Sequence, residues 1–253
     1  MRNMPRQLKP AAVVIDRRFA GGITVALSLA VVLLAALIVS WLVYSVHRGS
    51  GLARLDESTA QWGAAHATDA STRTLRAITM LGATPIIAAV ATVPAAVSLA
   101  RRRFGPLAHL TIVCTGVSIL NNGLKLLIHR RRPEFDRLTT AAGWSFPSGH
   151  SAAAAAGWAA IALVAFGRSS IRWRAAGAFA AILIAAVVGA SRVLLGVHWL
   201  TDVIAGVTVG WSWFLVVTLL FGRSLLGSGQ PDSRGTSELV EPEGRVPPQG
   251  DKP

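Results

Sequence analysis

The chain has 253 residues, of which 52% are hydrophobic and only 15% are charged, and its mean hydropathy is +0.51. A soluble domain of this size needs more polar surface than such a composition provides, which argues against a globular soluble protein. The net charge of +13 comes from short basic clusters between long apolar stretches, and this pattern favours membrane orientation and anionic headgroups over nucleic-acid binding. We therefore expect an integral membrane protein whose partners are bilayer lipids and not nucleic acid.

Six apolar stretches are long enough to cross a bilayer, for which a helix needs about 20 residues. The apolar run of the first stretch, from Ile23 to Val46, is too long for a signal-peptide core, so we expect an uncleaved signal anchor. The predicted fold class is all-α, an integral membrane six-helix bundle. The expected spans are residues 20–46, 77–100, 107–128, 148–167, 175–195 and 199–222.

The segments outside the membrane domain, residues 20–222, differ in character. Residues 1–19 form a basic N-terminal segment. Residues 223–253 are rich in Gly, Pro, Ser and mixed charge and have little to bury, so we expect a disordered tail. Between the first two spans, residues 47–76 are predicted to be a polar loop with a short helix around Leu55–Trp62.

The arginines between the spans predict the orientation. If six spans alternate, Arg101–Arg103 and the Arg168–Arg174 loop lie on one side together with both termini. The positive-inside rule makes that side the cytoplasmic face of the plasma membrane and places residues 129–147 and 191–198 outside. Segment 129–137 is strongly basic although it lies on the outer side, which indicates a functional reason to hold cations there.

The first polar cluster ends the third span. Lys125 and Arg132 are seven residues apart, so they point the same way if the helix continues to its end, and Pro133 then forces the chain out of the helix. Snorkelling anchors at a membrane interface have the same composition, and this alternative stays open for the cluster taken alone. Asn121 and Asn122, one turn deeper, are expected to pack between helices and not to touch substrate.

The second cluster, Pro147 to His150, opens the fourth span. Pro147 suits the start of a helix, and Ser148 suits its N-cap. The free N–H groups of the first turn and the helix dipole favour an anion there. Gly149 lets a ligand approach the backbone closely, and His150 stands within its reach. The alternative is an ordinary turn before a helix, with an interfacial histidine.

The third cluster runs from Ser191 to Asp202. His198 and Asp202 are i and i+4 on one helix face, close enough for a carboxylate–imidazole hydrogen bond. Such a bond fixes the tautomer of the ring and leaves Nε2 free as a nucleophile or base. Asp202 also lies one turn inside a span, where an unpaired carboxylate is costly, and Arg192 ends the fifth span nearby. The alternative is a purely structural histidine–aspartate pair.

Together the clusters contain three cations, two histidines and one carboxylate, with no acidic cluster that could hold a metal ion. The single cysteine, Cys114, can form neither an intrachain disulfide nor a cysteine metal site. All three clusters fall on the same membrane side under an orientation derived without them. We therefore expect one active site at the outer ends of helices 3 to 6, which grips a phosphate while a histidine attacks it.

At these residues the chain resembles the type 2 phosphatidic acid phosphatase superfamily, which also includes vanadium haloperoxidases and glucose-6-phosphatase. The three-part signature of that family matches in full and in order, and the resemblance covers roughly residues 20–222. The matching segments are Lys125 to Pro133, Pro147 to His150 and Ser191 to Asp202.

The resemblance implies a role for each signature residue. His198 is similar to the nucleophile that forms a phosphohistidine, and Asp202 is similar to its orienting partner. His150 resembles the acid that protonates the leaving oxygen and then the base that activates water. The residues that resemble the phosphate clamp and its support are Lys125, Arg132, Ser148, Gly149 and Arg192.

Three fixed cations can neutralise a phosphate as a magnesium ion does elsewhere, so we expect no metal and no other cofactor. His129, Arg130 and Arg131 flank the clamp and are expected to meet a second phosphate or the headgroups.

The expected function is hydrolysis of a lipid phosphate or diphosphate at the outer face of the plasma membrane, with undecaprenyl diphosphate as the first substrate. Phosphatidylglycerophosphate, phosphatidic acid, and phosphoryl transfer to an acceptor lipid are alternatives that use the same residues. A vanadate-dependent peroxidase is disfavoured because those relatives are soluble. A transporter or scaffold is disfavoured because its ionisable residues would lie at mid-span depth, whereas these cluster at one end.

Overall fold

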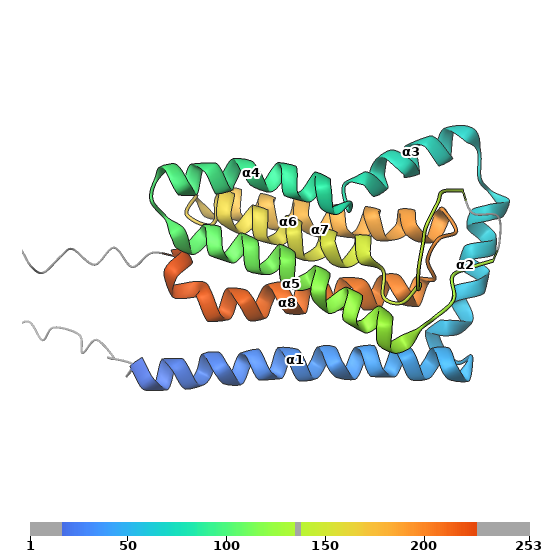
Figure 1. Ribbon diagram of the computed structural model, residues 1–253, viewed down its shortest axis with the longest axis horizontal. Helices are drawn as coiled ribbons and strands as arrows, with labels where there is room; N and C mark the ends of the chain where they lie inside the picture. Colours follow the sequence, from blue (N-terminus) through green and yellow to red (C-terminus); the bar gives the residue numbers. More distant parts are fainter. Residues whose placement is uncertain (1–16, 135–137, 227–253) are drawn as a thin grey trace, which may run out of the picture.

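The computed structural model describes residues 17–134 and 138–226, and every regular element in these two ranges is a helix (Figure 1). The predicted all-α class is therefore confirmed. In chain order the elements are α1 (Arg17–Arg48), the 3-10 turn η1 (Gly51–Ala53), α2 (Arg54–Ala65), α3 (Asp69–Met80), α4 (Thr84–Ala100), α5 (Phe104–Ile128), α6 (Gly149–Phe166), α7 (Ile171–Leu194) and α8 (Leu200–Leu226).

Within the described ranges, five helices are long and apolar enough to cross a membrane, and the bent pair α3–α4 raises the number to six. The five are α1, α5, α6, α7 and α8, and each agrees within a few residues with a predicted span. The chain is a multi-pass membrane protein. Residues 1–16, 135–137 and 227–253, which include most of the predicted N-terminal segment and tail, lie outside the described residues.

The second predicted span, residues 77–100, is wrong as a continuous helix. Residues 81–83 separate α3 from α4, and the two helix axes differ by 48°. A Cβ atom on Gly82 would lie 2.8 Å from the carbonyl oxygen of His150, so only glycine fits between the two backbones. Pro85 then starts a new helix. The break presses this part of the chain against the start of α6.

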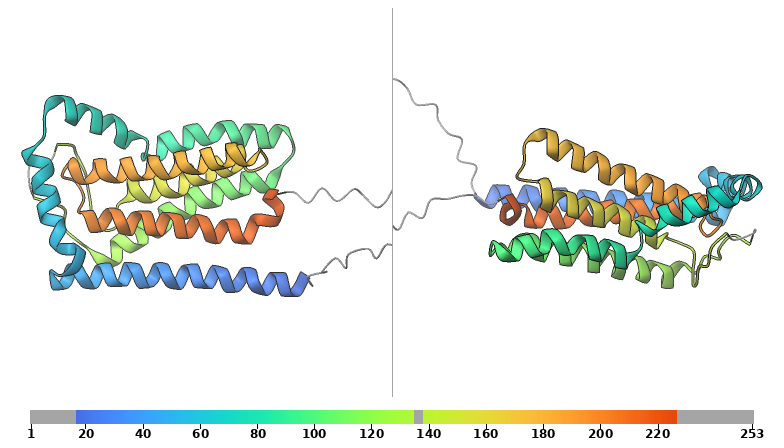
Figure 2. Two further views of the ribbon diagram at one scale, coloured as in Figure 1. Left: turned by 180° about the vertical axis from the view of Figure 1, so that it is seen from behind. Right: turned by 90° about the horizontal axis from the view of Figure 1, so that it is seen from above.

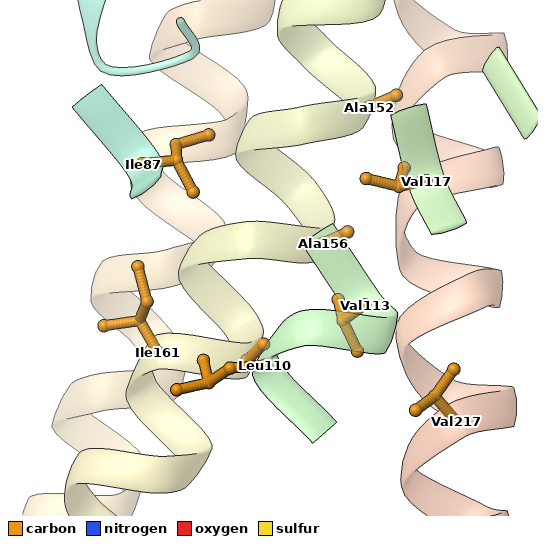
Figure 3. Packing of buried hydrophobic residues seen from close by; sticks show 9 residues of the cluster. Ile87, Leu110, Val113, Val117, Ala152, Ala156, Ile161 and Val217 are labelled. Carbon is orange, nitrogen blue, oxygen red and sulfur yellow. The ribbon is translucent and has the colours of Figure 1, made fainter. Parts of the chain in front are cut away.

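Helix α6 lies at the centre of the bundle, and α4, α5, α7 and α8 pack around it. Five of its alanines are almost fully buried, and their small side chains let the neighbouring helices approach closely. They are Ala152, Ala154, Ala155, Ala156 and Ala160. Figure 3 shows this core, in which larger side chains from the surrounding helices close around Ala152 and Ala156. The larger side chains include Ile87 of α4, Leu110, Val113 and Val117 of α5, and Val217 of α8.

The start of α6 is locked to the start of α8. The Ser148 N–H donates to the carbonyl oxygen of Asp202 at 2.9 Å. A Cβ atom on Gly206 would lie 2.5 Å from the carbonyl oxygen of Ser148, an approach that requires glycine. Backbone contacts therefore hold the second and third polar clusters against each other.

Helix α1 packs along α8 at the edge of the bundle (Figure 1). It exposes a continuous apolar surface, and Leu33 and Leu37 are 63% and 68% exposed. A lipid-facing span presents such a surface.

The two ends of the bundle carry different segments. Helix α2 runs across one end in all views (Figures 1 and 2), and it confirms the short helix predicted around Leu55–Trp62. The described part of segment 129–148 lies at the same end. The connections that contain Arg101–Arg103 and Arg168 lie at the opposite end.

Candidate active site

The three polar clusters meet at the end of the bundle that carries α2. Helices α5 and α7 end there, and α6 and α8 begin there. The ends of these helices and the connecting segments surround a cavity of about 620 Å³. The predicted site residues in its lining are Lys125, Arg132, Gly149, His150, Arg192 and His198.

His198 is buried between two groups of opposite charge. Its Nδ1 lies 3.3 Å from Oδ2 of Asp202, and its Nε2 lies 3.1 Å from Nη1 of Arg132. Because a guanidinium only donates hydrogen bonds, Nε2 accepts, and Nδ1 carries the proton that faces Asp202. This tautomer leaves a lone pair on Nε2, on the side of Arg132, which lines the cavity together with His198, and a nucleophilic or basic imidazole requires such a lone pair.

Burial keeps the His198 ring uncharged at neutral pH. The residue is 2% exposed, and burial lowers the pKa of His198 from 6.5 to about 4 because the imidazolium would lose its hydration. The Asp202 carboxylate opposes this effect, whereas Arg132 and Arg192 add to it. The ring is therefore available as a neutral base or nucleophile.

Lys125 and Arg132 reach the cavity from different elements. Helix α5 ends at Ile128, and His129 adopts a left-handed conformation with φ of 50°. The helix thus ends where the predicted span 107–128 ends, and it does not continue to Arg132, so the condition under which helical spacing would align the two cations is not met. The segment after α5 folds back, and this fold, not helical spacing, brings the two cations together.

Backbone carbonyl groups fix both cations. Arg132 donates through Nε to the carbonyl oxygen of Gly143 at 2.9 Å and through Nη1 to that of Val197 at 2.7 Å. Lys125 Nζ donates to the carbonyl oxygen of Trp144 at 2.5 Å. These neutral acceptors orient the cations without cancelling their charge, so the cavity stays positive.

Arg192 supplies the third cation from the end of α7. It is buried, and its Nη1 donates to Oγ1 of Thr79, on α3, at 3.0 Å. Its Nε has no hydrogen-bond partner among the described residues. A buried donor left without a partner costs about 1–3 kcal/mol. Because Arg192 lines the cavity, an anion bound there is a suitable acceptor.

The second cluster starts α6 as predicted, and the structure shows Ser148 as the cap of this helix and not as part of the cavity lining. Ser148 is the N-cap residue, and its hydroxyl accepts hydrogen bonds from the N–H of Ser151 and, at 2.9 Å, from its Oγ. Ser148 is fully buried and is not among the residues that line the cavity. Gly149 and His150 do line it. Their N–H groups belong to the first turn of α6, where a helix leaves its donors free for an anion.

Asp202 is fully buried and accepts hydrogen bonds from more groups than the i, i+4 spacing predicts. Besides His198, its Oδ2 accepts from the Ser145 hydroxyl and, at 3.0 Å, from the Trp199 N–H. Its Oδ1 accepts from Nη1 of Arg130 at 2.6 Å. Ser145 is therefore a residue of the site that the sequence did not reveal.

The prediction that Arg130 meets a second phosphate or the headgroups is wrong. Its guanidinium bridges two buried carboxylates, Asp202 and Asp56, and its Nη2 lies 2.7 Å from Oδ2 of Asp56. Of its neighbours, His129 packs edge-on against the Trp144 ring at 4.7 Å between centroids, and Arg131 is exposed. Only Arg131 is therefore left in a position where a charged headgroup can reach it.

The two asparagines near the end of α5 lie in different environments. Asn121 is buried between helices, as expected. Asn122 is exposed and lines the cavity, contrary to the expectation.

In the described parts of the chain, no group of three or more His, Cys, Asp or Glu residues could hold a metal ion. The charge that faces the cavity comes from Lys125, Arg132 and Arg192.

The chain is similar to a known family and to curated proteins. Residues 106–225 match the PAP2 superfamily. The chain is 42% identical over 101 residues to phosphatidylglycerophosphatase B of Bacillus subtilis (strain 168), which covers 39% of this chain and 50% of that protein. It is 34% identical over 145 residues to lipid A 1-phosphatase of Rhizobium etli, which covers 53% of this chain and 57% of that protein. The chain thus spans about half the length of these curated relatives.

The fold is similar to a solved structure, the crystal structure of a transmembrane PAP2 type phosphatidylglycerolphosphate phosphatase from Bacillus subtilis. The TM-score is 0.66 at 28% identity, and the match covers 76% of this chain and 94% of that one. The similarity to Aquifex aeolicus LpxE, with a TM-score of 0.51 at 21% identity over 64% of this chain and 94% of that one, supports the fold alone.

Proposed function

Because this chain belongs to the PAP2 superfamily through residues 106–225, we propose that it is a membrane phosphatase that hydrolyses lipid phosphates without a metal ion. One observation carries the proposal: Nε2 of His198 is unprotonated and accepts a hydrogen bond from Arg132, and His198 lines a cavity together with Lys125, Arg132 and Arg192. Phosphoryl transfer depends mainly on positioning and on charge neutralisation at the equatorial oxygens. The three cations provide both, and the histidine provides the nucleophile.

In the first step, His198 Nε2 attacks the phosphorus in line with the bond to the leaving oxygen. The N–P bond forms as the O–P bond breaks, and the imidazolium form of His150 gives a proton to the leaving oxygen and becomes neutral. Arg132 has by then exchanged its hydrogen bond with Nε2 for one with a phosphate oxygen. The ring keeps its Nδ1 proton and gains a positive charge, which the Asp202 carboxylate stabilises.

In the second step, water attacks the phosphohistidine. His150, which is now deprotonated, accepts a proton from this water while the N–P bond breaks and its electron pair returns to Nε2. Orthophosphate leaves and the enzyme is restored. An acceptor lipid in place of water would give phosphotransfer with the same residues, so release of free phosphate without an acceptor separates the two reactions.

The substrate that we expect first is undecaprenyl diphosphate. The cavity lies at the end of the spans, where the phosphate of a lipid can enter while its tail stays in the bilayer. Beside the cavity, a hollow of about 440 Å³ is lined by Arg131, Arg132 and Glu134. Arg132 lines both spaces, so Arg131 is within reach of a second phosphate, and this favours a diphosphate.

Phosphatidylglycerophosphate is the second candidate. The names of a curated relative and of the solved structure with 28% identity support it. Phosphatidic acid and lipid A 1-phosphate complete the set of substrates to be compared, the latter because of the Rhizobium relative.

Phosphate release by the purified full chain tests the proposal. The four lipids are supplied in detergent with EDTA, and kcat/KM is measured for each. We expect the highest kcat/KM with undecaprenyl diphosphate. Arg131→Gln is expected to lower kcat/KM for the diphosphate and to leave that for phosphatidic acid unchanged. Arg54→Gln, which removes an exposed arginine of α2 at the same end of the bundle, is the matched control. No phosphate release from any lipid would contradict the proposal.

The orientation is part of the same proposal. We infer that both termini are cytoplasmic and that the site faces outward, because Arg101–Arg103 and Arg168 lie at the opposite end of the bundle. In a Cys114→Ala background, Thr140→Cys should react with an impermeant thiol reagent in intact cells. Ser169→Cys should react only after the membrane is opened. Both side chains are exposed, so the reverse pattern would contradict the orientation and leave the chemistry unaffected.

A further inference from the structure

Helix α2 lies outside the part of the chain that matches the PAP2 superfamily, yet it contributes to the site. Asp56, in its first turn, is 3% exposed, and its Oδ2 lies 2.7 Å from Nη2 of Arg130. The same guanidinium donates through Nη1 to Oδ1 of Asp202 at 2.6 Å. One arginine thus connects a carboxylate from the N-terminal part of the chain to the carboxylate that orients His198.

Asp56 also holds the start of α8. Its Oδ1 accepts the N–H of Thr201 at 2.9 Å, and its Oδ2 accepts the Thr201 hydroxyl at 2.7 Å. Asp202 accepts the N–H of Trp199, the residue before the helix. The first N–H groups of a helix have no partner within it. Here two carboxylates supply partners, one from the helix itself and one from α2.

The charges of this network matter for the nucleophile. Arg130 stands between two carboxylates, so Asp56, Arg130 and Asp202 together carry one negative charge. That charge balances the positive charge that the His198 ring gains when it binds phosphorus. Without the Asp56 charge, Arg130 alone would cancel Asp202, and the ring would become positive beside a pair with no net charge. In a buried site such an imbalance is costly.

We propose that Asp56 and Arg130 are positioning residues that hold the Asp202 carboxylate in place and keep its negative charge effective toward His198. The inference rests on the proposed phosphatase reaction at His198. It assigns to α2 a role in the chemical step, beyond anchoring a loop to the bundle. The effect should therefore fall on kcat, because neither residue lines the cavity where the substrate binds.

The test compares Asp56→Asn, Arg130→Gln and the double variant. Asp56→Asn keeps the shape but removes the charge, and we expect kcat to fall by roughly tenfold to a hundredfold, the range known for groups that orient histidines bound to metal ions. KM should be unchanged. The double variant restores a net charge of one negative unit, so its kcat should exceed that of Asp56→Asn. Glu57→Gln is the matched control, because the neighbouring carboxylate of α2 is exposed and accepts a hydrogen bond from Gln61 of the same helix.

A purely structural role makes a different prediction. The double variant would then be at least as impaired as either single variant, and each would lose thermal stability in step with activity. That result, or a normal kcat in Asp56→Asn, would overturn the inference. If Asp56→Asn does not purify as folded protein, Arg130→Lys and Arg130→Gln decide instead. Lysine keeps a positive charge between the carboxylates and should retain the higher kcat, and equal values would overturn the inference.

Failure of this inference is distinguishable from failure of the proposed function. Wild-type protein and His198→Ala are measured beside the variants. If wild type releases phosphate and His198→Ala does not, the proposed function is supported. The kcat values of the Asp56 and Arg130 variants then test the inference separately. If wild type releases none, the proposed function fails first.

Discussion

The bundle contains two cavities of similar size, and their linings differ in charge. The cavity at the α2 end, of about 620 Å³, is lined by three cations, two histidines and Asn122. A second cavity, of about 480 Å³, lies between the distant halves of α6, α7 and α8, and alanine, leucine and aromatic side chains form most of its lining. The volumes are similar, so volume does not distinguish the two. The difference lies in the charges that the protein keeps buried.

The charged groups that form the site at the α2 end are held by specific partners, and the buried ones are costly to remove from water. Asp202 has four donors, and Arg132 has several backbone acceptors. In the apolar cavity the charged residue is Arg174, which is exposed. A bilayer would fill that cavity with acyl chains at little cost, because apolar walls and lipid tails are alike as solvents. Chemistry is therefore expected at the α2 end alone.

Removing the nucleophile should lower kcat more than any other change, whereas a change in the apolar cavity should not lower it. His198→Ala is expected to lower kcat by roughly 10⁶-fold, the effect seen when the nucleophile of a catalytic triad is removed. Leu163→Ala, a truncation in the lining of the apolar cavity, should leave kcat unchanged. Phosphate release by folded protein is the measurement. A His198→Ala variant with wild-type turnover would move the chemistry elsewhere.

Asp202→Asn should be the next largest effect. The imidazole remains but loses the carboxylate that selects its tautomer, and comparable changes lower kcat by about 10⁴-fold. A small activity should therefore survive, above that of His198→Ala. Measurement of both variants at the same enzyme concentration checks the order. Equal loss in both would mean that Asp202 does more than orient the ring.

Whether a contact of the site could be predicted depended on how far apart its two residues are in the sequence. The His198–Asp202 pair could be predicted because four residues on a helix form one face. The contacts of Asp56 with Thr201 cross 145 residues, and that of Arg192 with Thr79 crosses 113. No local spacing reports such pairs, because they exist only after the helices have packed. Asp56, Thr79 and Ser145 therefore could not be found from the sequence.

The break in the second span is a different case, because its signal was present. Gly82 and Pro85 lie within four residues of each other in the sequence, and both residues interrupt helices. The prediction of one span over residues 77–100 rested on apolar length alone and did not use these two residues. Ser148 was predicted as the N-cap of its helix from its position, and the structure confirms this, whereas its role as a support of the phosphate clamp came from the family resemblance alone. In the structure the Ser148 hydroxyl is buried and accepts hydrogen bonds from Ser151.

The pH dependence should show a smaller effect that also belongs to the buried site. Burial lowers the pKa of His198 to about 4, so the ring is neutral, and able to attack, above that pH. As the pH is lowered, protonation of His198 should therefore reduce kcat/KM only well below pH 6.5. The phosphate of the substrate is titrated separately, and its contribution is subtracted. Measurement of kcat/KM from pH 4 to pH 8 tests this. An enzyme group that titrates near 6.5 and controls the attack would contradict the buried, neutral nucleophile.

The smallest expected effect is that of a chelator. Lys125, Arg132 and Arg192 already face the cavity, and fixed cations neutralise the equatorial oxygens as a metal ion would. We therefore expect phosphate release to be unchanged in EDTA and not to rise when magnesium is added. Vanadate, whose five-coordinate form resembles the transition state, should inhibit in competition with the lipid, and Arg192→Gln should weaken this inhibition. Loss of activity in EDTA with recovery in magnesium would show that the three cations do not suffice. The two cavities would then differ by a bound metal ion as well as by the charges of the chain.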